Sequence, residues 1–287
     1  MEESLEMPKV SIIIPTYNSG ETLAECLKSI HGQNYLFYEV IVVDNFSSDD
    51  TLKIAKEFGA KIIQQKCNPA LARNIGIANS TGKYILFLDS DQVLSPSVVE
   101  ECVRKCENEK VGMVRIPEVF TGESFWSFCS AVWKNYYEEV ERLYGSSRNI
   151  IHGEPRFFIK EQITRVGMLD TALFWGEDYD LYEKLKKANV KEAKCKSKIY
   201  HHELISIRKI LIKNLRYGKS MPIFLQQTKK QVFSLMLRHA LLTFREVFRN
   251  FKKSPGIIVG CAVLLCLKTY SRVIGLLIGL ASLINKG

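Results

Sequence analysis

Two carboxylates follow a short hydrophobic segment in the first half of the chain. Residues 84–88, Tyr-Ile-Leu-Phe-Leu, run directly into Asp89 and Asp91. Such a run predicts a buried central strand of a parallel sheet, and open α/β sheets bind ligands beyond the carboxyl ends of their strands. Neighbouring carboxylates repel each other unless a cation offsets their charge. Their hard oxygen atoms suit Mg²⁺ or Mn²⁺, which can bridge nucleotide phosphates. The alternative is two solvated acids in a turn.

Alternating strand and helix patterns surround this segment and must position it. Buried strands are predicted at 10–15, ended by Pro15, at 39–45, ended by acidic Asp44, and at 61–64. Helical spacing of apolar residues and N-capping side chains predict helices between them, within 18–30, 47–59 and 70–79. This alternation predicts a parallel, doubly wound sheet with right-handed crossovers. Asp44 should then lie at the same sheet edge as Asp89 and Asp91.

The segment between Asp91 and the end of the acidic part of the chain is predicted to contain shorter elements. We expect a strand at 111–116, an amphipathic helix at 125–144, strands within 150–159 and a helix that begins near Glu177 and Asp178. Acids at a helix start are favoured by the helix dipole alone. Alternatively, Asp178 is a general base that deprotonates a hydroxyl.

Composition excludes several classes of protein. No G-x-G-x-x-G follows the first strand and no P-loop motif is present, which disfavours a dinucleotide oxidoreductase and a P-loop nucleotidase. The eight cysteines contain no C-x-x-C, and the acidic, polar start of the chain is unlike a secretory signal. We therefore expect reduced thiols in a cytosolic setting.

The charge is unevenly distributed along the 287 residues. Of the 40 Lys and Arg residues, 15 lie in 205–287 beside a single acid, Glu246, whereas 1–204 carries a small net negative charge. The tail is therefore a separate physical part. Its basic stripes alternate with apolar faces, and Gly218 and Pro222 are expected to break its first helix. A basic amphipathic helix of this kind indicates a membrane surface, and its apolar blocks argue against nucleic acid.

The last segment, 256–284, contains two apolar blocks separated by Lys268 and Arg272. Each block is shorter than the roughly 20 residues that a membrane span needs. A continuous span would bury both cations near its centre, so we expect interfacial or re-entrant association. Lys268, Arg272, Gly275 and Gly279 share one helical stripe, which alternatively serves a homo-oligomer through the C-terminal helices.

Five motifs, in order, resemble family 2 glycosyltransferases of the GT-A fold. They are Val-Ser-Ile-Ile-Ile-Pro-Thr-Tyr-Asn at 10–18, Val-Ile-Val-Val-Asp-Asn-Phe-Ser-Ser-Asp-Asp-Thr at 40–51, Ala-Arg-Asn-Ile-Gly at 72–76, Phe-Leu-Asp-Ser-Asp at 87–91 and Gly-Glu-Asp-Tyr-Asp-Leu at 176–181. The resemblance implies an α/β protein with a GT-A type, Rossmann-like, mostly parallel sheet that carries helices on both faces. The C-terminal helical region would be membrane-associated, which divides the chain into 1–204 and 205–287.

The resemblance also implies roles for individual residues. Donor-binding positions would be Pro15, Thr16, Tyr17, Asp44, Arg73, Asn74, Ser90 and Gly153, with the metal at Asp89, Asp91 and His202, and catalysis at Asp178 and Glu177. Arg73 could instead pair with a neighbouring acid. His201 and His202 should point to opposite faces of a strand, so at most one reaches the metal, and we expect His202. Glu154 and Pro155 follow Gly153 where many relatives have a small residue, which leaves the sugar open.

The function expected from the sequence is a metal-dependent inverting glycosyltransferase at the cytoplasmic face of the cell membrane. It would use Mn²⁺ or Mg²⁺ and a UDP- or GDP-linked sugar, and transfer the sugar to a lipid-linked or other glycan acceptor. The alternatives are a polyprenyl-phosphate hexose synthase and a catalytically silent nucleotide-sugar-binding subunit. Val93 stands where some such synthases have Gln, which disfavours the first, and the intact acids disfavour the second.

Overall fold

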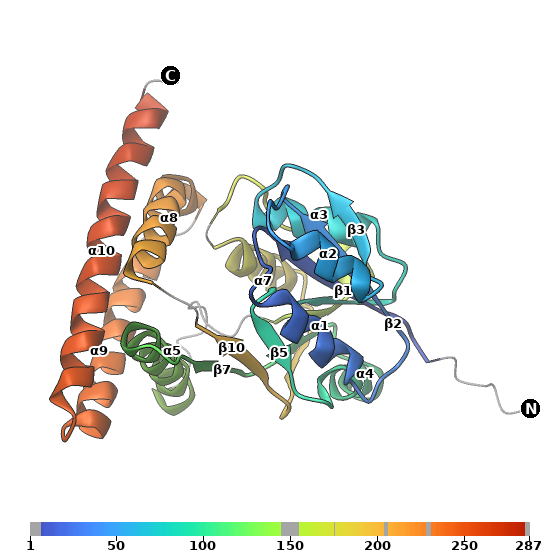
Figure 1. Ribbon diagram of the computed structural model, residues 1–287, viewed down its shortest axis with the longest axis horizontal. Helices are drawn as coiled ribbons and strands as arrows, with labels where there is room; N and C mark the ends of the chain where they lie inside the picture. The colour runs from blue at the N-terminus through green and yellow to red at the C-terminus, as the bar shows by residue number, and fades with distance from the viewer. Residues whose placement is uncertain (1–6, 145–154, 175, 204–205, 228–230, 285–287) are drawn as a thin grey trace, which may run out of the picture. The chain divides into compact units, whose positions relative to one another are not determined.

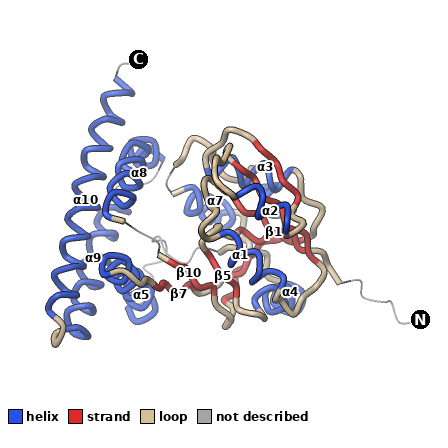
Figure 2. Tube along the Cα trace, viewed as in Figure 1, coloured by secondary structure: helices blue, strands red, loops and turns tan. Residues whose placement is uncertain are grey.

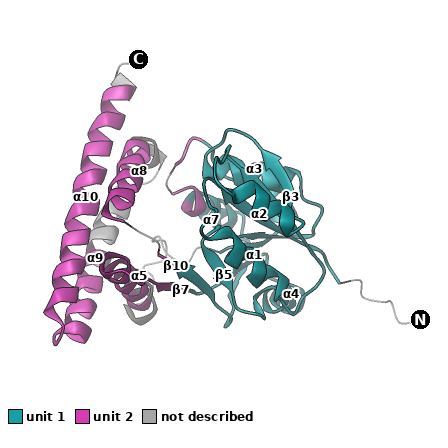
Figure 3. Ribbon diagram, viewed as in Figure 1, with its two compact units in different colours: residues 1–118, 153–171, 180–201 teal, residues 119–152, 172–179, 202–287 magenta. Residues whose placement is uncertain are grey.

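The computed structural model describes residues 7–144, 155–174, 176–203, 206–227 and 231–284 (Figure 1). The chain forms two compact units (Figure 3). Residues 1–118, 153–171 and 180–201 form the first unit, and residues 119–152, 172–179 and 202–287 form the second. The second unit therefore adds two segments from before residue 204 to the basic tail.

The first unit is built on a seven-stranded sheet with the order β3-β2-β1-β4-β8-β6-β9. Its strands are β1 Val10–Thr16, β2 Tyr38–Asp44, β3 Lys61–Gln64, β4 Tyr84–Phe87, β6 Met113–Arg115, β8 Phe157–Ile159 and β9 Glu192–Lys194. Only β8 runs antiparallel to its neighbours β4 and β6. The predicted GT-A type, mostly parallel sheet is thus confirmed.

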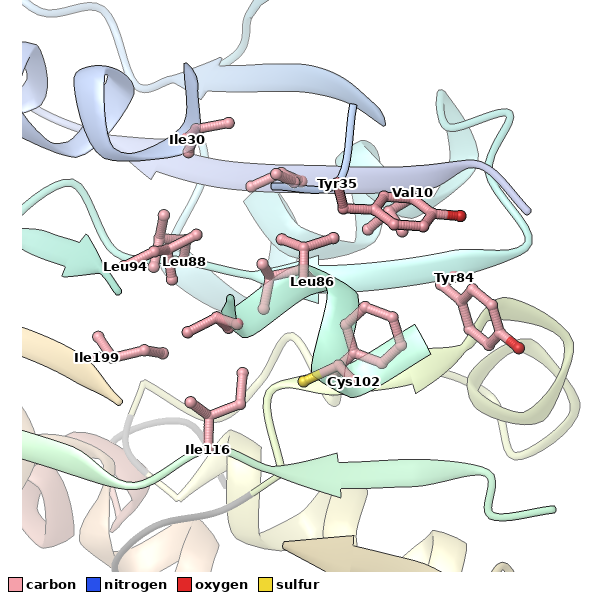
Figure 4. Close-up of a cluster of buried hydrophobic side chains, with 14 of the residues drawn as sticks. Val10, Ile30, Tyr35, Tyr84, Leu86, Leu88, Leu94, Cys102, Ile116 and Ile199 are labelled. Carbon is pink, nitrogen blue, oxygen red and sulfur yellow. The ribbon is translucent and has the colours of Figure 1, made fainter. Parts of the chain in front are cut away.

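Helices cover both faces of this sheet, as predicted. They are α1 Leu23–His31, α2 Thr51–Glu57, α3 Pro69–Ala78, α4 Val98–Glu109, α6 Lys160–Arg165 and α7 Glu177–Lys187. Because side chains alternate along a strand, Leu86 of β4 packs with α1 and α4 on one face, whereas Ile85 and Phe87 pack with α3, α6 and α7 on the other. Figure 4 shows the first of these clusters, with Leu86 at its centre and Ile30 and Cys102 among its members.

Pro15 does not end the first strand, contrary to the sequence prediction. β1 continues to Thr16 and pairs with β2 along its whole length, but it pairs with β4 only as far as Ile13. Beyond Ile13, β1 has lost one neighbour, so the missing Pro15 N–H removes no hydrogen bond on that side.

Sequence patterns did not predict the small second sheet. It has the order β5-β10-β7, with β5 Gln92–Leu94, β10 Ile199–His202 and β7 Glu118–Thr121. β10 runs antiparallel to β5 and pairs His201 with Gln92. Strands of three or four residues are too short to carry a periodic pattern. This sheet brings residues far apart in the sequence to the end of β4.

The second unit is largely helical (Figure 2). Its helices are α5 Phe125–Tyr144, α8 Ile207–Gln227, α9 Gln231–Phe251 and α10 Pro255–Ile284. The predicted break at Gly218 and Pro222 is wrong, because α8 runs through both residues. A Cβ on Gly218 would overlap the carbonyl oxygen of Arg272, and one on Gly275 would overlap that of Leu215. These glycines let α8 and α10 approach closely, and the packing offsets the weak helix propensity of glycine.

The two apolar blocks of the tail form one continuous helix. Within α10, Pro255–Ser282 is long and apolar enough to cross a membrane, with a mean hydropathy of 1.8. Lys268 and Arg272 face the unit's own interior, where Lys268 Nζ donates to Ser130 Oγ (3.2 Å) and Arg272 Nε donates to Asn214 Oδ1 (2.8 Å). The stripe that could have faced another subunit therefore packs within the chain. The side chains of Val259, Tyr270, Val273, Leu277 and Leu280 are exposed.

Candidate active site

Asp89 and Asp91 lie in a tight turn between β4 and β5. Gln92 closes this turn, since its Oε1 accepts from the Asp89 N–H (2.9 Å) and its own N–H donates to the Asp89 carbonyl oxygen (3.0 Å). Gln92 is completely buried, whereas the Asp91 side chain is 41% exposed. The turn thus keeps Gln92 in the interior and presents the Asp91 side chain to solvent.

Two arginines hold the Asp89 carboxylate. Arg73 Nη2 lies 2.9 Å from Asp89 Oδ1, and Arg156 Nη1 lies 3.3 Å from Asp89 Oδ2. Burial would raise the pKa of Asp89, but the two guanidiniums and His201 hold it well below its usual range. Arg73 is carried by α3, whose Gly76 lets the helix pack directly on Ile13 of β1. Arg73 pairs with a neighbouring acid in this structure, and its predicted contact with donor phosphates stays a prediction.

A second carboxylate, Glu118 of β7, lies behind this turn. Glu118 Oε1 accepts from Arg156 Nε (2.5 Å), and Glu118 Oε2 lies 3.4 Å from His201 Nδ1 and 3.3 Å from Gln92 Nε2. The other ring nitrogen, His201 Nε2, lies 3.1 Å from Asp91 Oδ2. Burial would raise the pKa of Glu118, but Arg156 and His201 lower it to about 2, so this buried carboxylate is ionised.

The structure brings His201, not the expected His202, to the acidic turn. The two side chains point in opposite directions from β10, as strand alternation requires. His202 Nδ1 lies 2.9 Å from Thr121 Oγ1. The opposite directions of the two rings were predictable from the sequence. Which ring points to the turn depends on the pairing of β10 with β5. A metal at this turn would therefore meet His201 together with Asp91.

Asp44 lies at the end of β2 and is fully buried. Its carboxylate accepts from Thr16 Oγ1 (2.9 Å), from the N–H and hydroxyl of Ser47 (2.9 and 2.5 Å) and from Gln64 Nε2 (3.3 Å). A nucleobase N–H that bonded to this carboxylate would therefore have to replace one of these donors. Tyr17 follows Thr16 and is 57% exposed, so its ring is available to a ligand.

The remaining predicted site residues have mixed surroundings. Asn74 ties α3 to the loop after α6, because its amide bonds both the carbonyl and the N–H of Leu169 (2.9 and 3.1 Å). Ser90 donates to Ser19 Oγ (2.9 Å). Glu177 and Asp178 form the first turn of α7 and are partly buried. Gly153 lies outside the described residues.

Four candidate residues were not predicted: Gln92, Glu118, Arg156 and His201. Arg156 directly precedes β8, and Glu118 begins β7, so both reach the turn only through strand pairing. Of these four, only His201 was indicated by the sequence, as one of the adjacent pair His201 and His202.

Comparison with known proteins identifies the family. Residues 11–166 match glycosyl transferase family 2. The chain belongs to this family. It is similar to an uncharacterized glycosyltransferase, RP339, of Rickettsia prowazekii, at 31% identity over 64% of this chain and 60% of that protein. It is also similar to glycosyltransferase AglE of Haloferax volcanii, at 29% identity over 74% of this chain and 73% of that protein.

Solved structures share the fold of this family 2 chain. The mannosyltransferase PcManGT of Pyrobaculum calidifontis, determined with GDP-Man and Mn²⁺, covers 97% of this chain and 87% of its own at a TM-score of 0.59 and 19% identity. TarS 1–349 of S. aureus, determined with UDP-GlcNAc, covers 93% of this chain and 88% of its own at a TM-score of 0.54 and 16% identity. The GT-A fold predicted for this family 2 chain is thus confirmed.

The donor atoms at the turn fit a hard divalent cation. Two ligands at right angles on an octahedral ion, each at about 2.1 Å, lie about 3.0 Å apart. Asp91 Oδ2 and His201 Nε2 are 3.1 Å apart. Among the described residues, no group of three or more His, Cys, Asp or Glu side chains is arranged so that it could bind one metal ion. Asp89 has both oxygens against guanidiniums, which makes Asp91 and His201 the pair that fits.

Proposed function

We propose that this family 2 enzyme transfers a sugar, with inversion, from a nucleoside diphosphate sugar to a lipid-linked acceptor at a membrane. The observation that carries the proposal is the convergence of Asp89, Asp91, Arg73, Arg156 and His201 at the carboxyl end of β4. Nucleotide sugars bind at this end of open α/β sheets through phosphate-directed charges. UDP- and GDP-linked sugars are both candidates, because the two similar structures named above contain one of each.

We assign the divalent cation, Mn²⁺ or Mg²⁺, to Asp91 and His201, with Asp89 behind them. When bound there, it would offset the charge of the departing diphosphate. Arg73 and Arg156 contribute positive charge from the chain itself, in a fixed planar form that suits phosphate oxygens. We assign the nucleoside to Tyr17 and Asp44, together with Pro15 and Thr16, with Asp44 exchanging one of its present donors for a base N–H. We assign Asn74 and Ser90 to the support of the loops around the donor.

Asp178 is assigned the general base, with Glu177 beside it in the first turn of α7. The carboxylate takes the proton of the acceptor hydroxyl as the hydroxyl oxygen bonds to the anomeric carbon. The bond from that carbon to the diphosphate oxygen breaks, and its electrons leave with the nucleoside diphosphate. A single displacement of this kind inverts the anomeric centre and needs no nucleophile from the enzyme.

The membrane assignment rests on α10. Its exposed positions, Val259, Val263, Tyr270, Val273 and Leu277, repeat at helical spacing on one face, while Lys268 and Arg272 on the opposite face have partners inside the unit. Lys268 and Arg272, whose charges argued against a helix embedded in lipid, can therefore remain out of contact with lipid. The basic residues of 205–287 add attraction to anionic lipid, and the cytoplasmic face supplies nucleotide sugars. A lipid-linked acceptor would reach the enzyme in the same plane.

In the test, the full-length chain in vesicles is incubated with radiolabelled UDP- or GDP-sugars. Three kinds of vesicle are compared: with lipid-linked glycan, with polyprenyl phosphate, and with neither. Label that enters the lipid fraction only with lipid-linked glycan and divalent cation supports the proposal. Label on polyprenyl phosphate would make the chain a hexose synthase instead. Donor that binds but is neither hydrolysed nor transferred would make it a silent subunit. The Asp91→Asn variant serves as the inactive control.

A further inference from the structure

Phe46 is an exposed aromatic residue in the loop that follows β2, two residues after Asp44. It is 60% exposed, and its φ of 55° lies in the left-handed region. A bulky residue other than glycine is rarely found in that region. Such conformations persist where surrounding contacts hold them, and they cluster at ligand-binding sites. Neither burial nor backbone preference therefore accounts for a phenylalanine at this position.

Hydrogen bonds hold the loop that carries Phe46. The N–H and the hydroxyl of Ser47 both donate to the Asp44 carboxylate (2.9 and 2.5 Å). Ser47 Oγ also accepts from the Asn18 N–H (2.8 Å), and Asn18 Oδ1 accepts from the Ser48 N–H (2.9 Å). The loop after β2 is therefore tied both to Asp44 and to the segment after β1. These bonds keep Phe46 in its left-handed conformation.

Phe46 and Tyr17 are neighbours of the two hydroxyl residues that hold the Asp44 carboxylate. Asp44 Oδ1 accepts from Thr16 Oγ1 (2.9 Å) and from Ser47 Oγ (2.5 Å). Tyr17 directly follows Thr16. Phe46 directly precedes Ser47, and because Ser47 N lies 2.9 Å from Asp44 Oδ2, the Phe46 Cα lies within about 6 Å of that oxygen. Two exposed aromatic residues thus flank the acid that we assign to the nucleobase.

We propose that Phe46 stacks on the nucleobase of the donor, across the base from Tyr17. The inference rests on the proposed function for its ligand, a nucleoside diphosphate sugar, and adds a binding residue to that site. A base whose polar edge meets Asp44 still has two π-faces to cover, and aromatic side chains stack on the face of any base. A loop that is already ordered loses little freedom when the base binds. The unusual backbone at Phe46 is the conformation that presents its ring to the base.

Phe46→Gly tests the proposal, because glycine adopts a positive φ without strain and has no ring. The variant should be at least as stable as the wild type, yet bind nucleotide more weakly. Titration calorimetry with UDP and with GDP, on the full-length proteins in detergent with Mn²⁺, measures the dissociation constants. For a nucleotide that the wild type binds, loss of one aromatic stack should weaken binding about 5- to 150-fold. Phe46→Tyr keeps a ring and should bind as the wild type does.

Two matched variants control for the two changes that Phe46→Gly makes. Lys110→Gly replaces another left-handed residue, with a φ of 53°, at the C-terminal end of α4. Phe37→Ala removes another exposed ring, directly before β2 and therefore at the opposite end of that strand from Asp44. Both variants should bind UDP and GDP as the wild type does. Inorganic diphosphate has no base, so its affinity should be the same in the wild type and in Phe46→Gly.

The kinetics of sugar transfer provide a second readout. A base is held equally in the ground state and in the transition state, so Phe46→Gly should raise the KM for the donor and leave kcat unchanged. Wild-type nucleotide affinity in Phe46→Gly, or an equal loss of affinity for inorganic diphosphate, would overturn the role of Phe46 and leave the proposed function standing. A wild type that binds neither UDP nor GDP would refute the proposed donor, and the stacking role with it.

Discussion

The guanidinium of Arg73 lies 2.9 Å from the Asp89 carboxylate, and this pair connects α3 to the end of β4. Arg73 is 4% exposed, and its guanidinium also lies over the ring of Phe87. The Asp91 carboxylate, two residues further on, is more exposed and contacts His201. The two acids of one short motif therefore have different surroundings, and different consequences follow from their removal.

Asp89→Asn should destabilise the protein much more than Asp91→Asn. The first substitution leaves Arg73 and Arg156 without their shared carboxylate, and loss of one partner of a buried ion pair costs about 3–5 kcal/mol. Since Asp89 keeps some exposure, about 2–3 kcal/mol is expected here, against less than about 1 kcal/mol for Asp91→Asn. Denaturation midpoints of the two variants in detergent measure the difference. Equal midpoints would show that Asp89 has no structural role.

Asp178→Asn should lower kcat strongly while donor affinity stays close to that of the wild type. General base catalysis contributes about 10²- to 10⁴-fold, and the amide retains the size of the side chain but cannot take a proton. Glu177→Gln, in the same helical turn, is the comparison. Donor affinity is measured by titration and kcat by product release. Collapse of donor affinity with preserved kcat would assign Asp178 a structural role and place the base elsewhere.

The sheet edge was predictable because its strands are long, apolar and ended by acids. The predicted strand at 61–64 matches β3, and the predicted strands ending at Asp44 and near Asp89 agree with β2 and β4 within one or two residues. Glu118, Arg156 and His201 were not predictable as a group, because they lie on strands of three or four residues or next to one, joined only in the folded chain. Similarly, a proline and a glycine predicted a break in α8 that packing against α10 overrides.

Gly218→Val should destabilise the second unit, whereas Gly256→Ala should not. A Cβ at Gly218 would overlap backbone atoms of Arg272 and Gly275 in α10, and backbone cannot move aside as a flexible side chain can. A Cβ at Gly256 meets nothing within 4 Å. Overpacking typically costs about 1–3 kcal/mol. Thermal unfolding in detergent compares the variants, and a Gly218→Val midpoint equal to that of Gly256→Ala would show that α8 and α10 do not pack this closely.

The stability of the first unit should fall as the pH decreases from about 4.5 toward about 2, partly through Glu39. Burial would raise the pKa of this carboxyl, but hydrogen bonds from Ser11 and Thr81, together with Lys9, lower it to about 2. A carboxyl whose pKa is lowered by folding stabilises the protein above its unfolded pKa, and that stabilisation is lost as pH falls through the folded pKa. A shift from 4.5 to about 2 corresponds to about 3.4 kcal/mol, which is an upper limit for this partly exposed group.

Glu39→Gln is the test of this assignment. The amide cannot titrate, so the variant should be less stable than the wild type at pH 7, and the difference should shrink toward pH 2. The carboxylate lies at the start of β2, at the opposite end of the strand from Asp44, so donor binding at pH 7 should be unaffected. A difference that does not change with pH would rule out Glu39 as a source of acid sensitivity.

The final prediction concerns α10 and lipid. If its exposed face contacts acyl chains, 1 M salt should not release the full-length protein from anionic vesicles, because salt screens charges and leaves apolar contacts intact.

The substitutions Val273→Lys and Leu277→Lys, both at exposed positions on that face, should weaken vesicle binding, since a lysine in the hydrocarbon core costs about 2.5–3.5 kcal/mol. The control is Glu246→Lys. Because Glu246 is buried and contacts Arg249, this substitution should lower the unfolding temperature instead. Flotation of vesicles measures retention. Release of the wild type by salt alone would show that this apolar face is covered by protein, and α10 would then belong to an interface between copies of the chain.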